Sequence, residues 1–247
     1  MRNLLRFEYH KIFRQKSFYV CFGIVFGMIF LNALLMKSLQ DGEADVVFRA
    51  AEFCESALSS ASFSMILGIF TALFVCDDYS NNTLKNIYAR GYSREKVYVS
   101  KYIASASVSL VMAVLCVAFA FALPIAIGGS EIALDSRLIG NLLAQLVVIL
   151  GYHALYFAVA MFIGKVGGSV AFNLVGPSLI LTALTLITSL LKIETLSFGN
   201  YWLDSAMKSL SAGSTDGSLL VRAVVMAAVY IGILIGGGLM LNHKKEI

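Results

Sequence analysis

The residues of this sequence that could do chemistry are few and lie far apart. Its three histidines are too distant from one another to form a local metal motif, and none of its four cysteines belongs to a C-x-x-C pair. The Gly164-Lys165 pair is followed by a valine, so the phosphate-binding pattern G-x-x-x-x-G-K-[ST] does not occur. We therefore expect no metal site, no cofactor held by this chain and no catalytic residue, and we do not expect nucleic acid as a partner.

One histidine nevertheless lies where an ionisable group is unusual. His153 falls near the middle of a long apolar run, between Tyr152 and Tyr156, and Asn173 lies in the next run. Ionisable side chains at membrane depth often mark a transport path, which makes these four residues candidates for one. The alternative is a neutral imidazole that shares a hydrogen bond with a hydroxyl or an amide inside a helix bundle, with the polar side chains acting in packing.

A second group of polar residues forms an island between two apolar runs, from Asp77 to Lys101. It holds five Lys or Arg residues against three acids. Asn81 or Asn82 can cap a helix that begins at about Thr83, and Gly91 can end it. Ser93 is placed to cap the helix that follows. One face of the short helix carries apolar residues at spacings of three and four, namely Leu84, Ile87 and Tyr88.

The elements that must position these residues are membrane spans. The chain is 59% hydrophobic and 14% charged, with a mean hydropathy of +0.81, which is far more apolar than an ordinary soluble domain. A span needs about 20 mostly apolar residues. The sequence predicts an all-α membrane protein, a single transmembrane domain over residues 1–247, with six transmembrane helices at about 17–36, 56–76, 102–128, 138–164, 167–191 and 223–243.

The segments outside the spans differ in charge. Residues 1–16 hold five basic residues and predict an N-terminal amphipathic helix in the membrane interface, with an apolar side made of Leu5, Tyr9, Ile12 and Phe13. With both termini in the cytosol, 13 Lys and Arg residues lie on the inner side and six on the outer side. Because basic residues favour the cytoplasmic side, the loop 77–101 is predicted to be cytoplasmic and the loop 192–222 to lie outside.

These features together resemble the membrane subunit of an ABC-2 type transporter. The architecture matches over nearly the whole chain, and the loop is the most specific part: Thr83, Leu84 and Lys85 are followed by Ser93 and Arg94, and then by a lysine at position 101. The family pattern has an acidic residue, then G-T-L, S-R and K. Here Asn81 and Asn82 stand before the threonine, and the acids Asp77 and Asp78 come slightly earlier.

The resemblance implies that the loop is a coupling helix on a separate ABC ATPase subunit, which binds the ATP, and that a second permease subunit pairs with this chain as a homodimer or heterodimer. It also implies a bacterial plasma membrane and export of a peptide antibiotic, a drug or another amphiphile. The loop as a solvated topology marker, and the chain as a stand-alone secondary transporter or intramembrane enzyme, remain alternatives. The residues assigned to ATPase coupling are Thr83, Leu84, Lys85, Ile87, Tyr88, Arg90, Gly91, Ser93 and Arg94.

Overall fold

A computed structural model describes residues 1–42, 49–59, 61–128, 136–190, 202–211 and 217–244 of the chain. Within these ranges all regular structure is α-helical. The helices are α1 (Arg2–Arg14), α2 (Lys16–Gly42), α3 (Ala50–Ser59), α4 (Ala61–Ser80), α5 (Thr83–Ala89), α6 (Arg94–Gly128), α7 (Ser136–Ile163), α8 (Val166–Leu190), α9 (Leu203–Ser211) and α10 (Gly217–Lys244).

Six helical stretches of the described residues are long and apolar enough to cross a membrane. This confirms the predicted all-α class with six spans. The second stretch, Ala50–Ser80, combines α3 and α4 and begins six residues before the predicted apolar run. The other stretches are Lys16–Asp41, Arg94–Ile127, Ser136–Ile163, Val166–Leu190 and Gly217–Met240.

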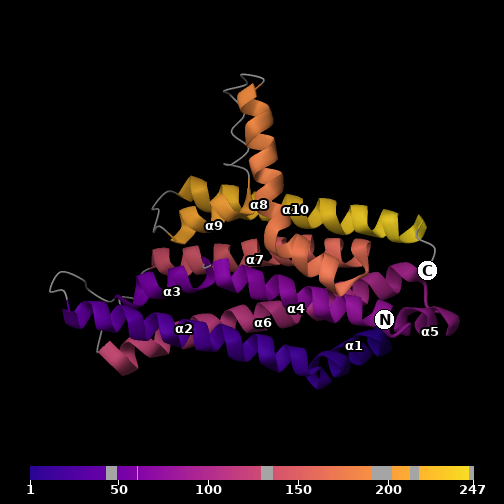
Figure 1. Cartoon of the computed structure of the whole chain (residues 1–247), viewed down its shortest axis with the longest axis horizontal. Helices are drawn as coiled ribbons and strands as arrows, with labels where there is room; N and C mark the ends of the chain where they lie inside the picture. Colours follow the sequence, from indigo (N-terminus) through magenta and orange to yellow (C-terminus); the bar gives the residue numbers. More distant parts are fainter. Residues whose placement is uncertain (43–48, 60, 129–135, 191–201, 212–216, 245–247) are drawn as a thin grey trace.

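The long helices lie side by side along the longest axis of the molecule (Figure 1). α1, α5 and the C-terminal end of α10 lie at one end, which we call the α5 end. α3 and α9 lie toward the opposite end. α7 packs against α3, α4, α6, α8, α9 and α10, so it is the central helix of the bundle.

Small residues let other helices approach α7 closely. A Cβ atom added at Gly151 would lie 3.2 Å from the Leu203 side chain of α9 and 3.5 Å from Ala227 of α10. Transmembrane helices gain most of their association energy from such close packing, because lipid is as apolar as the side chains themselves. The arrangement places the side chains of α7 that face α4 and α6 deep inside the protein.

The helix α8 bends about midway, and its second half stands away from the other helices (Figure 1). Gly176 and Pro177 lie in the middle of this helix. Proline lacks the N–H group of a helical hydrogen bond, and its ring collides with the carbonyl four residues earlier, so a bend is the expected result. The pair accounts for the bend of α8.

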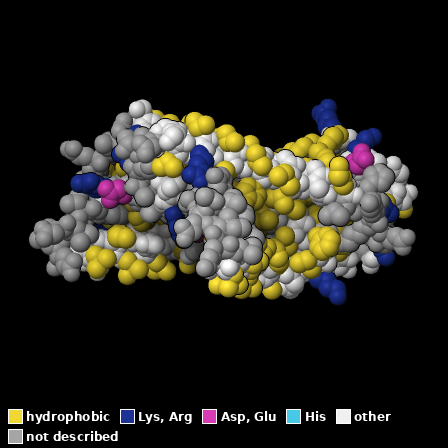
Figure 2. Space-filling model, turned by 90° about the horizontal axis from the view of Figure 1, so that it is seen from above, with side chains coloured by type: hydrophobic (Ala, Val, Ile, Leu, Met, Phe, Trp, Pro, Cys, Tyr) yellow, Lys and Arg dark blue, Asp and Glu magenta, His cyan; other side chains and the backbone are white. Residues whose placement is uncertain are grey.

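On the face seen in Figure 2, hydrophobic side chains form a broad area next to the α5 end, and Lys and Arg side chains stand out at that end. α1 contributes to the end through one buried side, Leu4, Glu8 and Ile12. Of the predicted apolar side, Ile12 is buried, Leu5 and Tyr9 are half-buried and Phe13 is 53% exposed. The location of α1 in a membrane interface stays a prediction.

Candidate functional site

The short helix α5 begins at Thr83, where the sequence predicts a helix start. Asn82 precedes it with a φ of 53°, and its side chain makes no capping hydrogen bond. Gly91 follows the helix with a φ of +84°, a left-handed conformation that favours glycine. The turn at Gly91 lets the chain reverse into α6, so α4, α5 and α6 form one continuous hairpin at the α5 end.

The apolar side of α5 is turned toward its own chain. Leu84 is 1% exposed and Ile87 is 8% exposed, and both pack against Leu4 of α1 and Val97 of α6. Leu84 and Ile87 therefore attach α5 to its own chain, and their assignment to ATPase coupling stays a prediction. The exposed side of α5 consists of Lys85, Asn86, Ala89 and Arg90.

The other predicted coupling residues surround this side. Gly91 and Ser93 are exposed, whereas Thr83, Tyr88 and Arg94 are half-buried. The Arg94 guanidinium lies 5.8 Å from the centre of the Tyr88 ring, a distance at which a cation and an aromatic face attract each other. This contact joins α5 to the start of α6.

Five charged residues of α1, α4 and α6 meet at the α5 end, and we call them the ionic network. Lys101 of α6 contacts Asp78 at the end of α4, and its Nζ lies 3.0 Å from Glu8 Oε2 of α1. Lys11 of α1 contacts the other oxygen of Asp78 and lies 3.2 Å from Asp77 Oδ2. The network thus joins three helices, with α5 between two of them.

Most of this charge is out of contact with solvent. The side chains of Glu8, Asp78 and Lys101 are fully buried, and that of Lys11 is 16% exposed. The Lys101 ammonium also lies 4.8 Å from the centre of the Phe74 ring, and that of Lys11 lies 5.2 Å from it. Removing ions from water is costly, and it is offset only when each ion keeps good partners.

Glu8 is the acid of the network that is least completely bonded. Its Oε1 atom has no hydrogen-bond partner among the described residues, whereas Oε2 accepts from Lys101. Burial raises the pKa of the Glu8 carboxyl above its usual value, and the charge of Lys101 acts in the opposite direction. The ion pair with Lys101 is therefore the interaction that favours a charged Glu8.

Four neutral side chains, the hydroxyl cluster, lie further inside the bundle. His153 Nδ1 is 3.3 Å from Thr71 Oγ1 and 3.2 Å from Ser109 Oγ, and its Nε2 is 3.0 Å from Ser105 Oγ. Each hydroxyl also donates to a backbone carbonyl of its own helix. His153 thus has the hydroxyl partners that the packing alternative requires, and its role in a transport path stays a prediction.

The remaining path candidates are dispersed. Tyr152 and Tyr156 are buried and stack on each other with ring centres 6.0 Å apart. Asn173 of α8 donates a 3.0 Å hydrogen bond to the Gly68 carbonyl of α4. Tyr152 lines a small cavity beside Asp204 and Met207, which none of the other three candidates lines. The structure packs all four candidates into helix contacts and does not gather them around one cavity.

Sequence analysis missed the ionic network because its members lie up to 93 positions apart. A partial signal exists: Glu8 is the one acid among the first 16 residues, and it lies three positions before Lys11. Neither fact identifies Lys101 as its partner. In the part of the chain that the structure describes, no three His, Cys, Asp or Glu residues are grouped as a metal site would require. The contacts that the charged residues of this end make are ion pairs between helices.

Comparison with known families gives one result. The model of a family described as ABC-2 family transporter protein matches residues 4–189, which is about three quarters of the chain. The match begins in α1 and ends in α8, so it contains α5 and every residue of the ionic network and the hydroxyl cluster. No curated protein matches the chain at a significant level.

Proposed function

Because this chain belongs to the ABC-2 transporter family, we propose that it is the permease subunit of an exporter whose separate ATPase binds the exposed side of α5. The exported compound is an amphiphile such as a peptide antibiotic or a drug. The excess of basic residues in 1–16 and 77–101 supports a cytoplasmic location of α5 and of both termini. The bacterial plasma membrane belongs to the proposal through the family resemblance alone.

The observation that carries this proposal is the two-sided burial of α5. Leu84 and Ile87 attach the helix to α1 and α6, while Lys85 and Arg90 on the other side remain exposed. A helix that is fixed on one side and presents cations on the other suits a contact with an acidic groove of a partner. The ATPase contact is therefore assigned to Lys85, Asn86, Ala89 and Arg90, with Gly91 and Ser93 at its edge.

The ionic network gives this contact a mechanical consequence. Glu8 and Lys11 lie on α1, Asp78 lies near the end of α4 and Lys101 lies in the first turns of α6, so the three helices are tied to each other at the α5 end. A displacement of α5 by ATP-driven closure of the ATPase would be passed to all three helices together, as in a shear or hinge movement of packed elements. The network residues are thus positioning residues for coupling.

The second half of α8 supports pairing with a second permease subunit. It stands away from the other helices (Figure 1) and exposes large apolar side chains. These are Leu179, Ile180, Leu186, Ile187 and Leu190. A second subunit packed against them would complete the arrangement, as a homodimer or a heterodimer.

The experiment is purification of the full chain from its native membrane, followed by identification of bound proteins and assay of ATP hydrolysis. We expect an ABC ATPase to be recovered with it. Replacing Lys85 and Arg90 together by glutamate should abolish that recovery, because the charge of the contact is reversed.

The matched control is Lys208→Glu on α9, an exposed cation far from α5 whose replacement should leave ATPase recovery unchanged. If no ATPase is recovered with the unaltered chain and transport continues without ATP, the proposal fails. The stand-alone secondary transporter would then be the better account. If α5 is only a topology marker, the Lys85 and Arg90 variant will bind the ATPase normally.

A further inference from the structure

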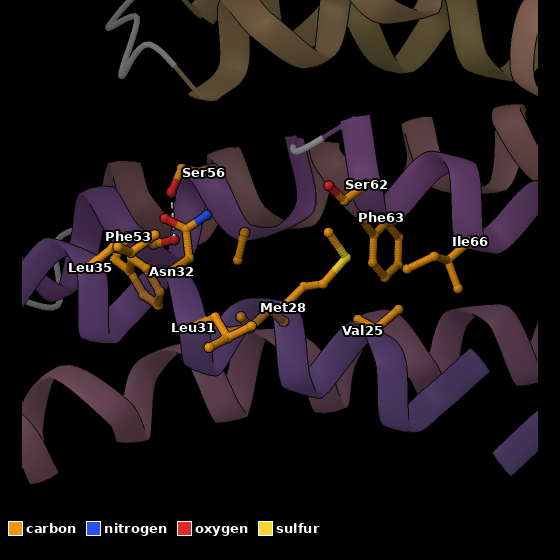
Figure 3. A pocket seen from close by; sticks show the side chains of 12 residues that line it. Val25, Met28, Leu31, Asn32, Leu35, Phe53, Ser56, Ser62, Phe63 and Ile66 are labelled. Atoms are coloured by element: carbon orange, nitrogen blue, oxygen red, sulfur yellow. Dashed lines mark hydrogen bonds between the residues drawn. The ribbon is translucent and has the colours of Figure 1, made fainter. Parts of the chain in front are cut away.

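A groove runs along the outside of the bundle between α2 on one side and α3 and α4 on the other (Figure 3). Its volume is about 230 Å³, and among the residues that the structure describes no charged one lines it. It lies on a different face of α4 from the His153 contacts, and none of the residues assigned to coupling or to a substrate path lines it. The groove is therefore a separate feature of the protein.

The groove contains one amide, at one of its ends. Asn32 lies with Ser56 at the end next to α3, beside Leu31, Leu35 and Phe53 (Figure 3). Val25, Phe63 and Ile66 lie at the other end with Ser62, and Met28 lies between the two ends. The Ser56 hydroxyl donates to the Phe53 carbonyl of its own helix. The Asn32 amide is exposed, and it forms no hydrogen bond with any residue that the structure describes.

An unpaired amide on a lipid-facing side of a span is unfavourable, because hydrocarbon offers it no partner. Packing inside the protein does not explain Asn32, in contrast to Asn141 and Asn173, whose amides bond to other helices. A ligand with a hydrogen-bonding group at this position would remove the penalty. The unpaired Asn32 amide thus indicates that this end of the groove binds a hydrogen-bonding group of a ligand.

The depth of the groove in the membrane follows from α2. The uncharged run of this helix is bounded by Lys16 and Lys37, and a lysine at the end of a span extends toward the interface. Asn32 precedes Lys37 by five positions, or ~7.5 Å along a helix, and Val25 precedes it by twelve, or ~18 Å. The Asn32 end of the groove is therefore close to the interface opposite α5, and the Val25 end lies in the hydrocarbon.

We propose that this groove is a binding site for a glycerolipid of the leaflet opposite α5. One acyl chain lies along Val25, Met28, Phe63 and Ile66, and the Asn32 amide donates a hydrogen bond to an ester carbonyl at the head of that chain. The amide of the groove lies on the side where the ester groups of a lipid in this leaflet lie. The absence of charge along the lining means that the acyl chain and ester are recognised, rather than a charged headgroup.

A bilayer lipid is the occupant because the groove opens sideways to lipid and holds its polar group at ester depth. An apolar tail gains little by leaving lipid for an apolar groove, so the hydrogen bond and the fit of the chain determine preference for this site. A bound chain would fill the space between α2 and the α3–α4 span and hold them at a fixed separation. This inference does not depend on the proposed ATPase or exported compound.

The test uses the full chain reconstituted in a bilayer of phosphatidylcholine that contains a trace of the same lipid with a photoactivatable diazirine in the middle of one acyl chain. After irradiation, labelled positions are identified by mass spectrometry of peptides. We expect labelling of Met28 and Phe63 above the level found on the other exposed side of α2. Asn32→Leu should lower it by about threefold, the factor expected from one hydrogen bond in a membrane.

The control is Leu34→Trp, which alters an exposed position of α2 that does not line the groove and should leave the labelling unchanged. Uniform labelling around α2, or equal labelling of the Asn32→Leu variant, would overturn the proposal. Displacement of the probe by a trace of a single-chain amphiphile, against the large excess of unlabelled phosphatidylcholine in the bilayer, would also overturn it, because the groove would then be a site for exported amphiphiles rather than for a bilayer lipid.

Discussion

The ionic network and the hydroxyl cluster are both buried, and both join α4 to α6, yet they depend on different bonds. Lys101 and Asp78 are charged, and their ion-pair partners lie on other helices. Ser105 and Ser109 are neutral, and each also donates to a carbonyl of its own helix. The two clusters lie one helix turn apart, since Ser105 donates to the carbonyl of Lys101.

This difference separates two uses of polar groups in one bundle. A hydroxyl that is satisfied by its own helix can lose its cross-helix partner at little cost. A buried ion that loses its partner keeps its full desolvation penalty. The network should therefore make the positions of α1, α4 and α6 interdependent. In the hydroxyl cluster, by contrast, each contact should stabilise the helix packing separately, so that one can be lost without the others.

The largest effect is expected for Lys101→Met. Methionine fills similar space but leaves Glu8 and Asp78 buried with only Lys11 as a nearby cation. Breaking a buried ion pair in this way costs about 3–5 kcal/mol of stability. The purified variant should therefore unfold at a clearly lower temperature in a thermal denaturation assay.

Lys96→Met serves as the control, because Lys96 is an exposed lysine of the same helix five positions earlier. It should unfold like the unaltered protein. Equal unfolding temperatures for Lys101→Met and Lys96→Met would mean that the network contributes no more than a solvated surface charge.

The second prediction concerns the double variant Glu8→Gln with Lys101→Met. It removes one negative and one positive buried charge together, and it leaves the contacts of Lys11 with Asp77 and Asp78 in place. The double variant should therefore be more stable than Lys101→Met alone, with a coupling of about 0.5–3 kcal/mol between the two sites. The free energies of unfolding of both single variants and the double variant measure it, and simple additivity would exclude the pairing.

Local patterns in the sequence were sufficient for much of this architecture. Apolar runs and their flanking charges predict the all-α fold and six spans, because a membrane requires long, internally bonded helices. The start of α5 at Thr83 and its end before Gly91 follow from residues that are adjacent in sequence. Such features need no knowledge of which helices touch.

The candidate site could be predicted less well, because it depends on which helices touch. The apolar face of Leu84 and Ile87 predicts a buried contact, but it does not tell whether α1 or a partner subunit covers it. The structure assigns the cover to Leu4, some 80 positions away. The sequence likewise does not tell which of its 15 acids pair with Lys101. Only the packed arrangement of α1 against α6 selects Glu8.

The smallest effect is expected for His153→Phe. The phenyl ring occupies nearly the same space against Tyr102 and Phe157, whose ring centres lie 5.6 Å and 6.2 Å from that of His153. The three hydroxyls keep their backbone acceptors, so the loss of stability should be about 0.6–1.7 kcal/mol, the range of single polar contacts between membrane helices.

Thermal denaturation and a transport assay on the same preparation separate two roles of His153. A small loss of stability with transport retained assigns His153 to packing, whereas normal stability with transport abolished would place it on the substrate path. The stability measurement also tests whether a change in the hydroxyl cluster affects the ionic network, because the cluster lies one turn from Lys101. A stability loss as large as that of Lys101→Met would mean that the two clusters form a single unit.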